Sequence, residues 1–500
     1  MLSLIYSLWE TQFSFYYYID FIMKNKTIIL YPFLFAIYPV VFLFAHNIEE
    51  VPITHFFLPL TAAFLMSVLL WFFLGFYIKD KIKRALALFF FFFIFYTYSH
   101  FYDFLYNLGL GLNILSIKHH YLILFLLILW AGLTYLIKKS TRKFHFTTKL
   151  LNIAAIFLIG YNFAAILHFE FKSFLIYTSF NKNIHKENIR DVDSNNTNLP
   201  DIYYIILDEF SNLSTVKKIF HFDHSAFAQN LEKRGFYIAY NSKTRYYRTE
   251  RSLAASLNMN YLKSSSNPFT LISHNSVSAY LYNKGYQIID FPINAKSKNA
   301  LAEMDFIYTK EKDSFLLNDF YQILLRKTMF RFFFEYMMQK KDFSNIFRKK
   351  ILNIFEKLET IPGIKGPKFI FAHILCPHEP YVFDRDGNLV DRKHFFNLRD
   401  KIYYLDQYIF ISKKITQLVD TLLKKSGNAP IIIIQSDHGI RGKIGGKNEL
   451  EVGDEWKKIF NAYYLPGKDT GVLYDSISPV NSFRLIFNLY FNDNFKLLDD

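Results

Sequence analysis

Three apolar runs beyond residue 200 each end in two neighbouring residues that could bind a metal ion or transfer a proton. The pairs are Asp208-Glu209, His378-Glu379 and Asp437-His438. Carboxylates and imidazoles without thiolates suit one divalent ion, with zinc or manganese preferred and calcium or magnesium as alternatives. A single Asp at the end of a strand usually caps a helix or forms a turn. Three such pairs on three strands instead favour one shared site.

The pair Asp437-His438 follows the run IIIIQS directly and precedes Gly439. A glycine lets the backbone turn sharply, so that both side chains can face one point. A neighbouring strand would supply a further carboxylate from Asp208 or Glu209, and Asp208 ends its apolar run directly. Three protein ligands leave an open position, which a catalytic metal needs.

The segment 241–262 supplies candidates for a nucleophile beside such an ion. The candidate hydroxyl groups are those of Thr244, Thr249 and Ser252. Thr249 comes just before an amphipathic helical pattern, where the helix dipole and free N–H groups can hold a phosphoryl or sulfuryl oxygen. Metal coordination would lower the pKa of its hydroxyl, whereas the simpler interpretation makes Thr249 only a helix cap. Arg248 and Arg251 flank it and are candidate substrate-binding residues, or ordinary exposed arginines.

Four runs that are apolar throughout predict the elements that position these residues. They span 202–208, 285–292, 368–378 and 429–439. Continuous apolar runs are typical of parallel strands buried on both faces, and helical patterns such as 315–360 separate them. The sequence therefore predicts an α/β domain with a mostly parallel central sheet. Ligands in such folds bind at the carboxyl ends of the strands, where the polar pairs occur.

The first third of the chain differs in composition. Hydrophobic residues make up 52% of the 59.5 kDa chain, which excludes a disordered chain and argues against a wholly soluble protein. Five apolar segments have about the length of a membrane span, at 27–46, 53–78, 85–107, 121–137 and 150–168. We therefore expect a helical transmembrane region at 1–170, a linker at 171–199 and an outer domain at 200–500. The single cysteine, Cys376, excludes an intramolecular disulfide and any multi-thiolate metal site.

The net charge of +15 invites a nucleic-acid interpretation, but many of the bases lie between the apolar segments. They precede the first, follow the second and separate the fourth from the fifth: Lys24, Lys26, Lys79, Lys81, Lys83, Arg84, Lys138, Lys139, Arg142, Lys143 and Lys149. By the positive-inside rule, the N-terminus is cytoplasmic and the chain after about residue 170 lies outside. A further span within 1–20 would invert this topology. We expect no nucleic-acid partner.

The motifs together resemble a known family. IYYIILDEF (202–210), SLAASLNMNYL (252–262), HILCPHEPYVFD (373–384) and IIIIQSDHG (431–439) resemble the sulfatase-like branch of the alkaline phosphatase superfamily, in the family's order. More narrowly, the chain is similar to bacterial membrane-anchored members, with the architecture of lipid A phosphoethanolamine transferases and lipoteichoic-acid synthases. The resemblance covers about 200–495.

The resemblance implies a metal held by Asp208 or Glu209, Thr249, Asp437 and His438. It further implies that His378 binds substrate or protonates the leaving group. The expected activity is metal-dependent transfer or hydrolysis of a phospho- or sulfo-ester through a covalent threonine intermediate. The enzyme would lie in the bacterial cytoplasmic membrane as a multi-pass protein, with its catalytic domain periplasmic or extracellular. Its partners would be a membrane lipid or lipid-linked donor and an envelope glycan or lipid acceptor.

Departures from the family narrow this expectation. Formylglycine-dependent sulfatases need the pattern C/S-x-P-x-R, which neither Cys376 nor Ser266 fits. No histidine follows His438, so we expect one essential metal rather than two. Three alternatives remain: a catalytically inactive sulfatase-like binding module on a membrane anchor, a sulfuric ester hydrolase, and a transporter with an external appendage.

Overall fold

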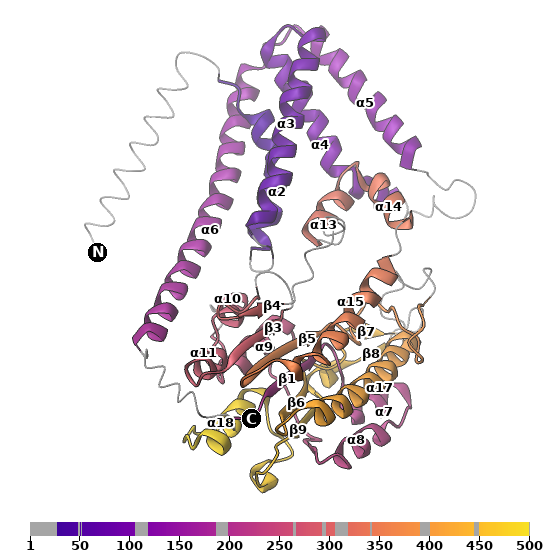
Figure 1. Ribbon diagram of the computed structural model, residues 1–500. Coiled ribbons are helices and arrows are strands. Elements are labelled where there is room, and N and C mark those ends of the chain that lie inside the picture. Colours follow the sequence, from indigo (N-terminus) through magenta and orange to yellow (C-terminus); the bar gives the residue numbers. More distant parts are fainter. Residues whose placement is uncertain are drawn as a thin grey trace. The chain divides into compact units, whose positions relative to one another are not determined.

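The computed structural model describes most of the chain (Figure 1). The described residues are 28–48, 51, 53–105, 119–186, 199–263, 267–292, 297–305, 319–340, 343–390, 401–444 and 450–499. A further span within 1–20 therefore lies outside the described residues. The chain divides into two compact units. The first unit holds Met1–Phe171 and Lys312–Lys341, and the second holds Lys172–Glu311 and Asp342–Asp500.

Five helices coincide with the five apolar segments that the sequence predicts to be membrane spans. They are α2 (Tyr31–His46), α3 (Thr54–Tyr77), α4 (Lys81–Leu105), α5 (His119–Lys139) and α6 (His145–Lys186). Four regions are long and apolar enough to cross a membrane: α3, α4, α5 and the His145–Lys172 part of α6. The helix α2 has only 16 residues, because it starts later than predicted, with Pro32 in its first turn. The helix α6 continues into the predicted linker, where no Gly or Pro occurs between residues 171 and 186.

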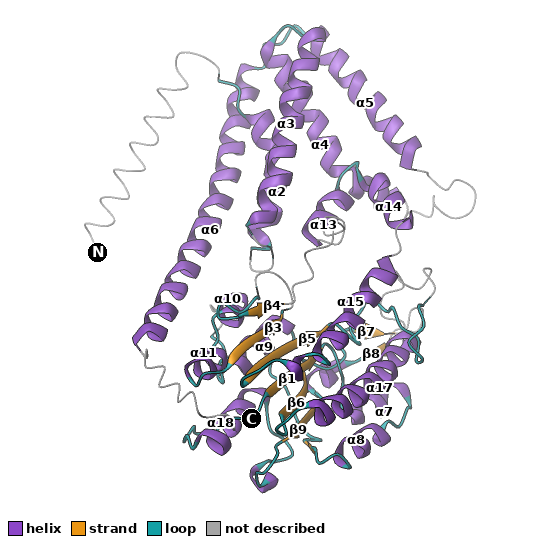
Figure 2. Cartoon of the chain, in the orientation of Figure 1, coloured by secondary structure: helices purple, strands orange, loops and turns teal. Residues whose placement is uncertain are grey.

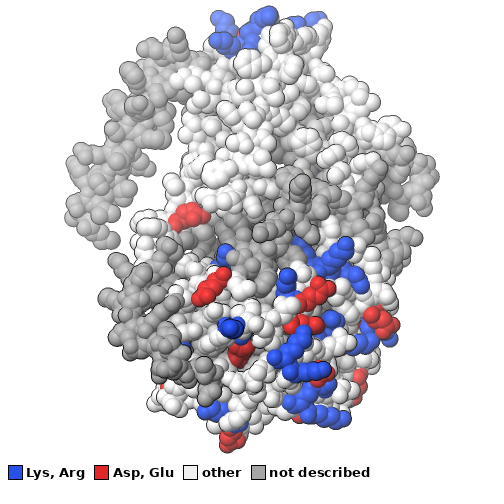
Figure 3. Space-filling model, in the orientation of Figure 1, with Lys and Arg blue, Asp and Glu red and all other residues white. Residues whose placement is uncertain are grey.

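The basic connections lie together at one end of the spanning helices. Lys83 Nζ donates to the backbone carbonyls of Lys138, at 3.2 Å, and Ser140, at 2.6 Å. The α3–α4 and α5–α6 connections are therefore side by side. Figure 3 shows Lys and Arg gathered at this end of the first unit, with few charged side chains over the remainder of the unit. This is the distribution that the positive-inside rule associates with the cytoplasmic side.

Two short helices from the later sequence also belong to the first unit. The pattern 315–360 forms three helices rather than one: α13 (Asp319–Lys327), α14 (Arg331–Lys340) and α15 (Phe343–Leu358). The first two lie in the range grouped with the spanning helices, whereas α15 belongs to the second unit. The chain therefore leaves the second unit and returns to it, within the range that the sequence assigns to a single outer domain.

The second unit is built on a seven-stranded sheet with the order β2-β9-β6-β1-β5-β3-β4. Its strands are β1 (Ile202–Leu207), β2 (Tyr237–Ile238), β3 (Gln287–Phe291), β4 (Met304–Asp305), β5 (Lys368–Ile374), β6 (Ile431–Ser436) and β9 (Asn461–Tyr464). The pairs β1–β5, β1–β6, β3–β5 and β3–β4 are parallel, whereas β9 is antiparallel to β6 and to β2. A separate two-stranded sheet joins β7 (Lys443–Ile444) to β8 (Leu450–Glu451). The mostly parallel sheet and all four predicted strands are thus confirmed.

Helices cover both faces of this sheet (Figure 2). The remaining α-helices are α7 (Leu213–Phe220), α8 (Ser225–Glu232), α9 (Thr249–Leu257), α10 (Pro268–Ser273), α11 (Ser276–Asn283), α17 (Lys401–Lys425) and α18 (Pro479–Phe491). Alternate residues of β1, such as Tyr204, pack into one core with side chains of α9, α11 and α18. The intervening residues, such as Tyr203, are equally buried and face the other side. Burial on both faces explains why β1 is apolar throughout.

Candidate active site

The central strand and its two neighbours end at one edge of the sheet. Leu207, the last residue of β1, pairs with Ile374 of β5 and with Ser436 of β6. The residues that follow β1 and β6 therefore emerge together, as parallel strands require. The side chains of Asp208, Asp437 and His438 each offer one ligand atom, and these atoms lie within 4.8 Å of one another.

This group of three has the properties of a cation site. All three side chains are buried, with relative exposures of 3% or less. Within the described part of the chain, Asp208 Oδ1 and Asp437 Oδ2 are buried without a hydrogen-bond partner. His438 Nε2 lies 3.7 Å from the first of these oxygens and 3.3 Å from the second. Buried carboxylate oxygens without donors carry a large desolvation cost, which a divalent ion would offset. The residues thus fit such an ion.

The imidazole of His438 is held in the orientation that this role requires. Its Nδ1 is 2.9 Å from the carbonyl oxygen of Gly439, so Nδ1–H donates there and Nε2 keeps a free lone pair. Gly439 itself is needed for space rather than for an unusual turn. A Cβ at this position would lie 2.6 Å from the Lys458 carbonyl oxygen and 2.8 Å from that of Glu455. The sequence predicted the need for glycine but not this cause.

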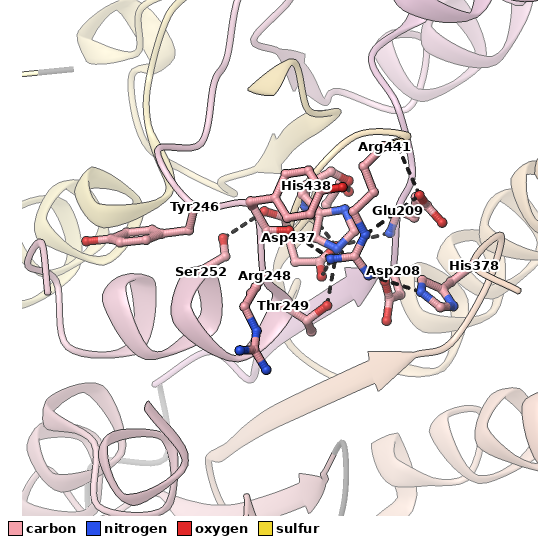
Figure 4. Close-up of polar contacts among 12 residues, drawn as sticks. Asp208, Glu209, Tyr246, Arg248, Thr249, Ser252, His378, Asp437, His438 and Arg441 are labelled. Carbon is pink, nitrogen blue, oxygen red and sulfur yellow. Dashed lines mark hydrogen bonds and ion pairs between the residues drawn. The ribbon is translucent and has the colours of Figure 1, made fainter. Parts of the chain in front are cut away.

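Thr249 is the first residue of α9, and its cap is Arg248 rather than Thr249 itself. The Thr249 hydroxyl oxygen lies 3.2 Å from His438 Nε2, at the edge of the group formed by Asp208, Asp437 and His438 (Figure 4). The other two candidate hydroxyls are engaged in the scaffold. Ser252 Oγ donates to the backbone carbonyl of Asp437 at 2.7 Å, and Thr244 Oγ1 lies 3.2 Å from Ser252 Oγ. Of these three candidates, Thr249 is the one whose hydroxyl oxygen contacts a possible ligand atom of the group, His438 Nε2.

The two acids after β1 have different environments. The left-handed backbone of Glu209, with φ of 62°, turns its carboxylate away from the group, and its Oε1 accepts from the backbone N–H of Arg441 at 3.1 Å. Burial raises the pKa of Glu209. Burial also opposes ionisation of Asp208, but the neighbouring histidines His378, His373 and His438 hold its pKa well below the usual range. Asp208 belongs to the group and Glu209 does not, so the geometry favours Asp208 as the ligand.

His378 lies on the loop that follows β5. Its backbone N–H donates to the carbonyl of Asp208 at 3.1 Å. The loop is fixed by the buried side chain of Gln407, which donates to the carbonyls of Pro377 and His378 and accepts from Val382. Burial lowers the pKa of His378, but the negative charges of Asp208 and Glu209 outweigh it and raise the value to about 8. These negative charges favour the protonated imidazole, which is the form that can donate a proton.

The arginine that reaches the site is Arg441, which sequence reasoning missed. One guanidinium nitrogen donates to the Tyr247 carbonyl at 2.8 Å, and another lies 3.2 Å from His378 Nε2 (Figure 4). The predicted Arg248 forms an ion pair with Glu250, and its side chain points away from Asp437 and His438 in Figure 4. Arg441 follows the Asp-His pair by only three residues, and this proximity was the signal available in the sequence.

Two further residues complete the description of the site. The guanidinium of the predicted Arg251 donates to the carbonyl of Lys263 at 3.3 Å and lies 5.9 Å from the centre of the Tyr246 ring. His373, within β5, was also missed, because a lone histidine in a strand resembles a buried core residue. Its Nε2 lies 3.2 Å from Asp208 Oδ2. The contact is with the carboxylate oxygen of Asp208 other than Oδ1, which lies toward His438. Residues that contact a metal ligand in this way commonly hold its orientation.

Comparisons with known proteins found matches among solved structures. No family model and no curated protein matches the chain. Among solved structures, the integral membrane lipooligosaccharide phosphoethanolamine transferase A of Neisseria meningitidis matches with 12% identity. The alignment covers 94% of this chain and 95% of that one, with a TM-score of 0.38. The chain is similar to envelope phosphoethanolamine transferases.

Two further matches cover a smaller share of this chain. The periplasmic domain of EptC from Escherichia coli, solved in complex with Zn, is 12% identical; the match covers 60% of this chain and 84% of that one, with a TM-score of 0.39. The lipoteichoic acid synthase LtaP from Listeria monocytogenes is 11% identical, with coverage of 63% and 79% and a TM-score of 0.39.

Proposed function

We propose that the protein is a metal-dependent transferase that moves a phosphoester group from a membrane lipid to an envelope lipid or glycan. The group would be carried on Thr249 as a covalent intermediate. One observation carries the proposal: the Thr249 hydroxyl faces a buried group of Asp208, Asp437 and His438 in which two carboxylate oxygens have no donor. Nucleophile and charge-stabilising residues thus lie within reach of one phosphorus atom.

The first half of the reaction follows from these positions. A divalent ion bound by Asp208, Asp437 and His438 would lower the pKa of the Thr249 hydroxyl and neutralise charge on the transferred group. Thr249 gives its hydroxyl proton to water, its Oγ1 attacks phosphorus, and the bond from phosphorus to the leaving alcohol breaks. His378 in its protonated form gives a proton to the oxygen that leaves. Arg441, beside His378, binds a non-bridging oxygen of the group.

The second half reverses the roles of the same residues. His378, now neutral, accepts the proton of an acceptor hydroxyl, whose oxygen attacks the phosphothreonine. The bond to Thr249 breaks and the group passes to the acceptor. Attachment to membrane-spanning helices keeps the site near lipid donors and acceptors, which favours transfer over hydrolysis by raising their effective concentration. The missing formylglycine motif argues against sulfuric ester hydrolysis.

The proposal extends to where the reaction takes place. Three basic segments flank or separate the predicted spans, and two of them lie together at one end of the spanning helices, which assigns that end to the cytoplasm. Because α6 begins at that end and is long enough to cross once, the second unit would lie on the outer side of a bacterial cytoplasmic membrane. The catalytic domain, residues 200–500 apart from the excursion of α13 and α14, would then meet periplasmic or extracellular acceptors.

The test uses the full-length protein in lipid nanodiscs with zinc or manganese. Phosphatidylethanolamine, phosphatidylglycerol and an aryl sulfate are offered in turn as donors, and intact-protein and peptide mass spectrometry locate any adduct. We expect a headgroup-phosphate adduct on Thr249, lost in Thr249→Ala together with turnover. Thr421→Ala, which removes a surface hydroxyl of α17, serves as the matched control and keeps the adduct.

Three results would contradict the proposal. Turnover by Thr249→Ala at the parent's rate would exclude the threonine intermediate. A folded protein that retains no stoichiometric divalent ion after equilibration with zinc and manganese would instead indicate a binding module without catalysis. Products formed with water at the same rate in the presence and absence of an acceptor would identify a hydrolase.

A further inference from the structure

The helices α13 and α14 pack into the same cores as the spanning helices. The backbone N–H of Met329, between the two helices, donates to the carbonyl of Phe95 in α4 at 3.1 Å. The Ser99 hydroxyl of α4 donates to the carbonyl of Arg326. Phe320 of α13 lies in a hydrophobic cluster with residues of α2 and α3, and its ring contacts Phe44. The pair is thus a docked part of the first unit.

Ion pairs fasten α14 to the ends of α4 and α5. Arg331 Nη1 lies 2.7 Å from Asp103 Oδ1, and Arg331 Nε lies 2.8 Å from Glu335 Oε1. Glu335 Oε2 lies in turn 2.8 Å from His119 Nε2, and His119 Nδ1 is 2.7 Å from the Tyr98 hydroxyl. Networked pairs of this kind fix geometry better than isolated surface pairs. The helix α14 therefore has a defined orientation on α4 and α5.

This attachment lies at the end of α4 away from the basic connections. Lys83, in the first turn of α4, bonds to the α5–α6 connection, whereas Asp103 lies in the last turn. Twenty residues of helix at about 1.5 Å each separate these two positions by about 30 Å. That is about the thickness of a hydrocarbon core. Asp103 and its partners therefore lie at the opposite boundary of the membrane.

The side of α14 that is exposed, and does not pack on the spanning helices, is aromatic. Phe332, Phe333 and Tyr336 are 44%, 49% and 51% exposed, and their spacing places them on one side of the helix, whereas Phe334 is buried. The neighbouring ends of the spanning helices expose similar side chains, with Phe104 of α4 at 60% and Tyr121 of α5 at 62%.

The basic residues at the end of α13 also suit a position beside a lipid surface. Arg326 and Lys327, both exposed, end α13 and would meet lipid phosphates. In addition, Phe104 and Tyr121 lie at the helix ends to which the ion pairs attach α14. Water is an unfavourable neighbour for exposed aromatic rings that gather at one place.

We propose that α13 and α14 lie in the interface between water and the spanned membrane, on the side opposite the basic connections. Phe332, Phe333 and Tyr336 are then inserted among the phospholipid chains. Aromatic rings with adjacent bases are typical of helices that lie in this interface. The excursion between β4 and α15 then anchors the second unit to the bilayer a second time, in addition to the chain that follows α6. The proposal is independent of the chemistry assigned to Thr249.

The experiment measures the surroundings of α14 with a spin label in the full-length protein. The native Cys376 is completely buried, and unmodified protein provides the check that it takes no label. A nitroxide is attached to Phe333→Cys and, separately, to Tyr336→Cys, in vesicles of phosphatidylethanolamine and phosphatidylglycerol. The matched control is Gln229→Cys, an exposed position on α8 of the second unit. Collision rates with oxygen and with a water-soluble nickel chelate are then compared.

We expect both α14 labels to collide mainly with oxygen and the α8 label mainly with nickel. Oxygen concentrates in lipid and the chelate stays in water, so the ratio should differ at least about tenfold between the helices. Nickel accessibility at both α14 positions equal to that of the α8 label would overturn the proposal. Labelling at two positions guards against local distortion by either substitution, and a loss of the Thr249 adduct would leave this outcome unaffected.

Discussion

The contact of Gly439 with two backbone carbonyls makes Gly439→Ala a sharp test of the metal site. The new Cβ would lie 2.6 Å from the Lys458 carbonyl oxygen, whereas ordinary contact begins at 3.4 Å. The loop that carries Asp437 and His438 must therefore shift by about 0.8 Å, since backbone cannot rotate out of the way as a flexible side chain can. A displacement of this size matters at a site built for one ion.

Two effects of different size follow from this shift. Overpacking of a buried position costs about 1–3 kcal/mol of folding free energy, which thermal unfolding of the metal-free protein will report. Misplacement of ligands by about 1 Å costs about 100-fold in catalysis, and we expect a loss of that order in adduct formation on Thr249. Zinc affinity, measured by competition with a fluorescent chelator, should fall by about 10- to 100-fold, as it does when ligands lose their orientation.

The control for this substitution is Gly427→Ala, in the turn before β6. A Cβ there meets nothing within 4 Å, and the backbone φ is not positive, so alanine fits without strain. It should match the parent in stability, zinc affinity and adduct formation. Zinc affinity of Gly439→Ala equal to that of the parent, with intact folding, would refute the assignment of the Asp437-His438 loop as a metal site.

Three further predictions test other contacts. Arg441→Ala should reduce kcat/KM for the lipid donor by about 10- to 100-fold, because it removes one charge-assisted hydrogen bond of about 1.5–3 kcal/mol. The control Arg251→Ala should leave kcat/KM within about twofold of the parent value. Equal effects of the two substitutions would reject Arg441 as the anion-binding residue. His373→Gln should lower zinc affinity by about 10-fold through loss of the contact with Asp208, without changing KM for the donor, and unchanged zinc affinity would mean that this contact does not orient the ligand. Burial raises the pKa of Glu335, but hydrogen bonds from its partners lower it overall to about 2. The ionised Glu335 carboxylate therefore stabilises the attachment of α14 fully at a pH above its unfolded pKa of about 4.5, and this stabilisation is lost as the pH falls toward 2. A spin label on α14 should become mobile over that pH range. In Glu335→Gln the label should be mobile already at neutral pH, and a label that stays immobile there would show that the ion pairs do not hold α14.

Local patterns were sufficient to predict the central elements of the second unit. The strands β1, β5 and β6 are apolar throughout because both faces are buried, and each run carries its own signal. The rule that ligands gather at the carboxyl ends of parallel strands then brings Asp208, Asp437 and His438 together without any knowledge of register. In the structure, these three side chains lie together as the buried group.

Features that depend on three-dimensional context were not predictable. The choice between Asp208 and Glu209 depends on the left-handed backbone at Glu209, which is rare for a glutamate. The direction of Arg251 depends on how α9 is rotated about its axis, and Arg441 reaches His378 through a bend after the Asp-His pair. No pattern of spacing reports such rotations.

The assignment of α13 and α14 to the first unit was missed for a different reason. Their apolar residues recur at helical spacing, and such a pattern fits a soluble core as well as a membrane boundary. Only the contacts of Met329 and Arg331 with α4 distinguish the two environments. Aromatic residues beside Arg326 and Lys327 were the one available hint.

The central position of β1 has a consequence for biogenesis. This strand is the first of the sheet to be synthesised, yet both of its neighbours, β5 and β6, come from more than 160 residues later in the chain. The segment IYYIIL must therefore stay unpaired and strongly β-prone until β5 has been made. On the proposed outer side of the membrane, chaperones that shield short aromatic and aliphatic stretches should favour maturation of this protein.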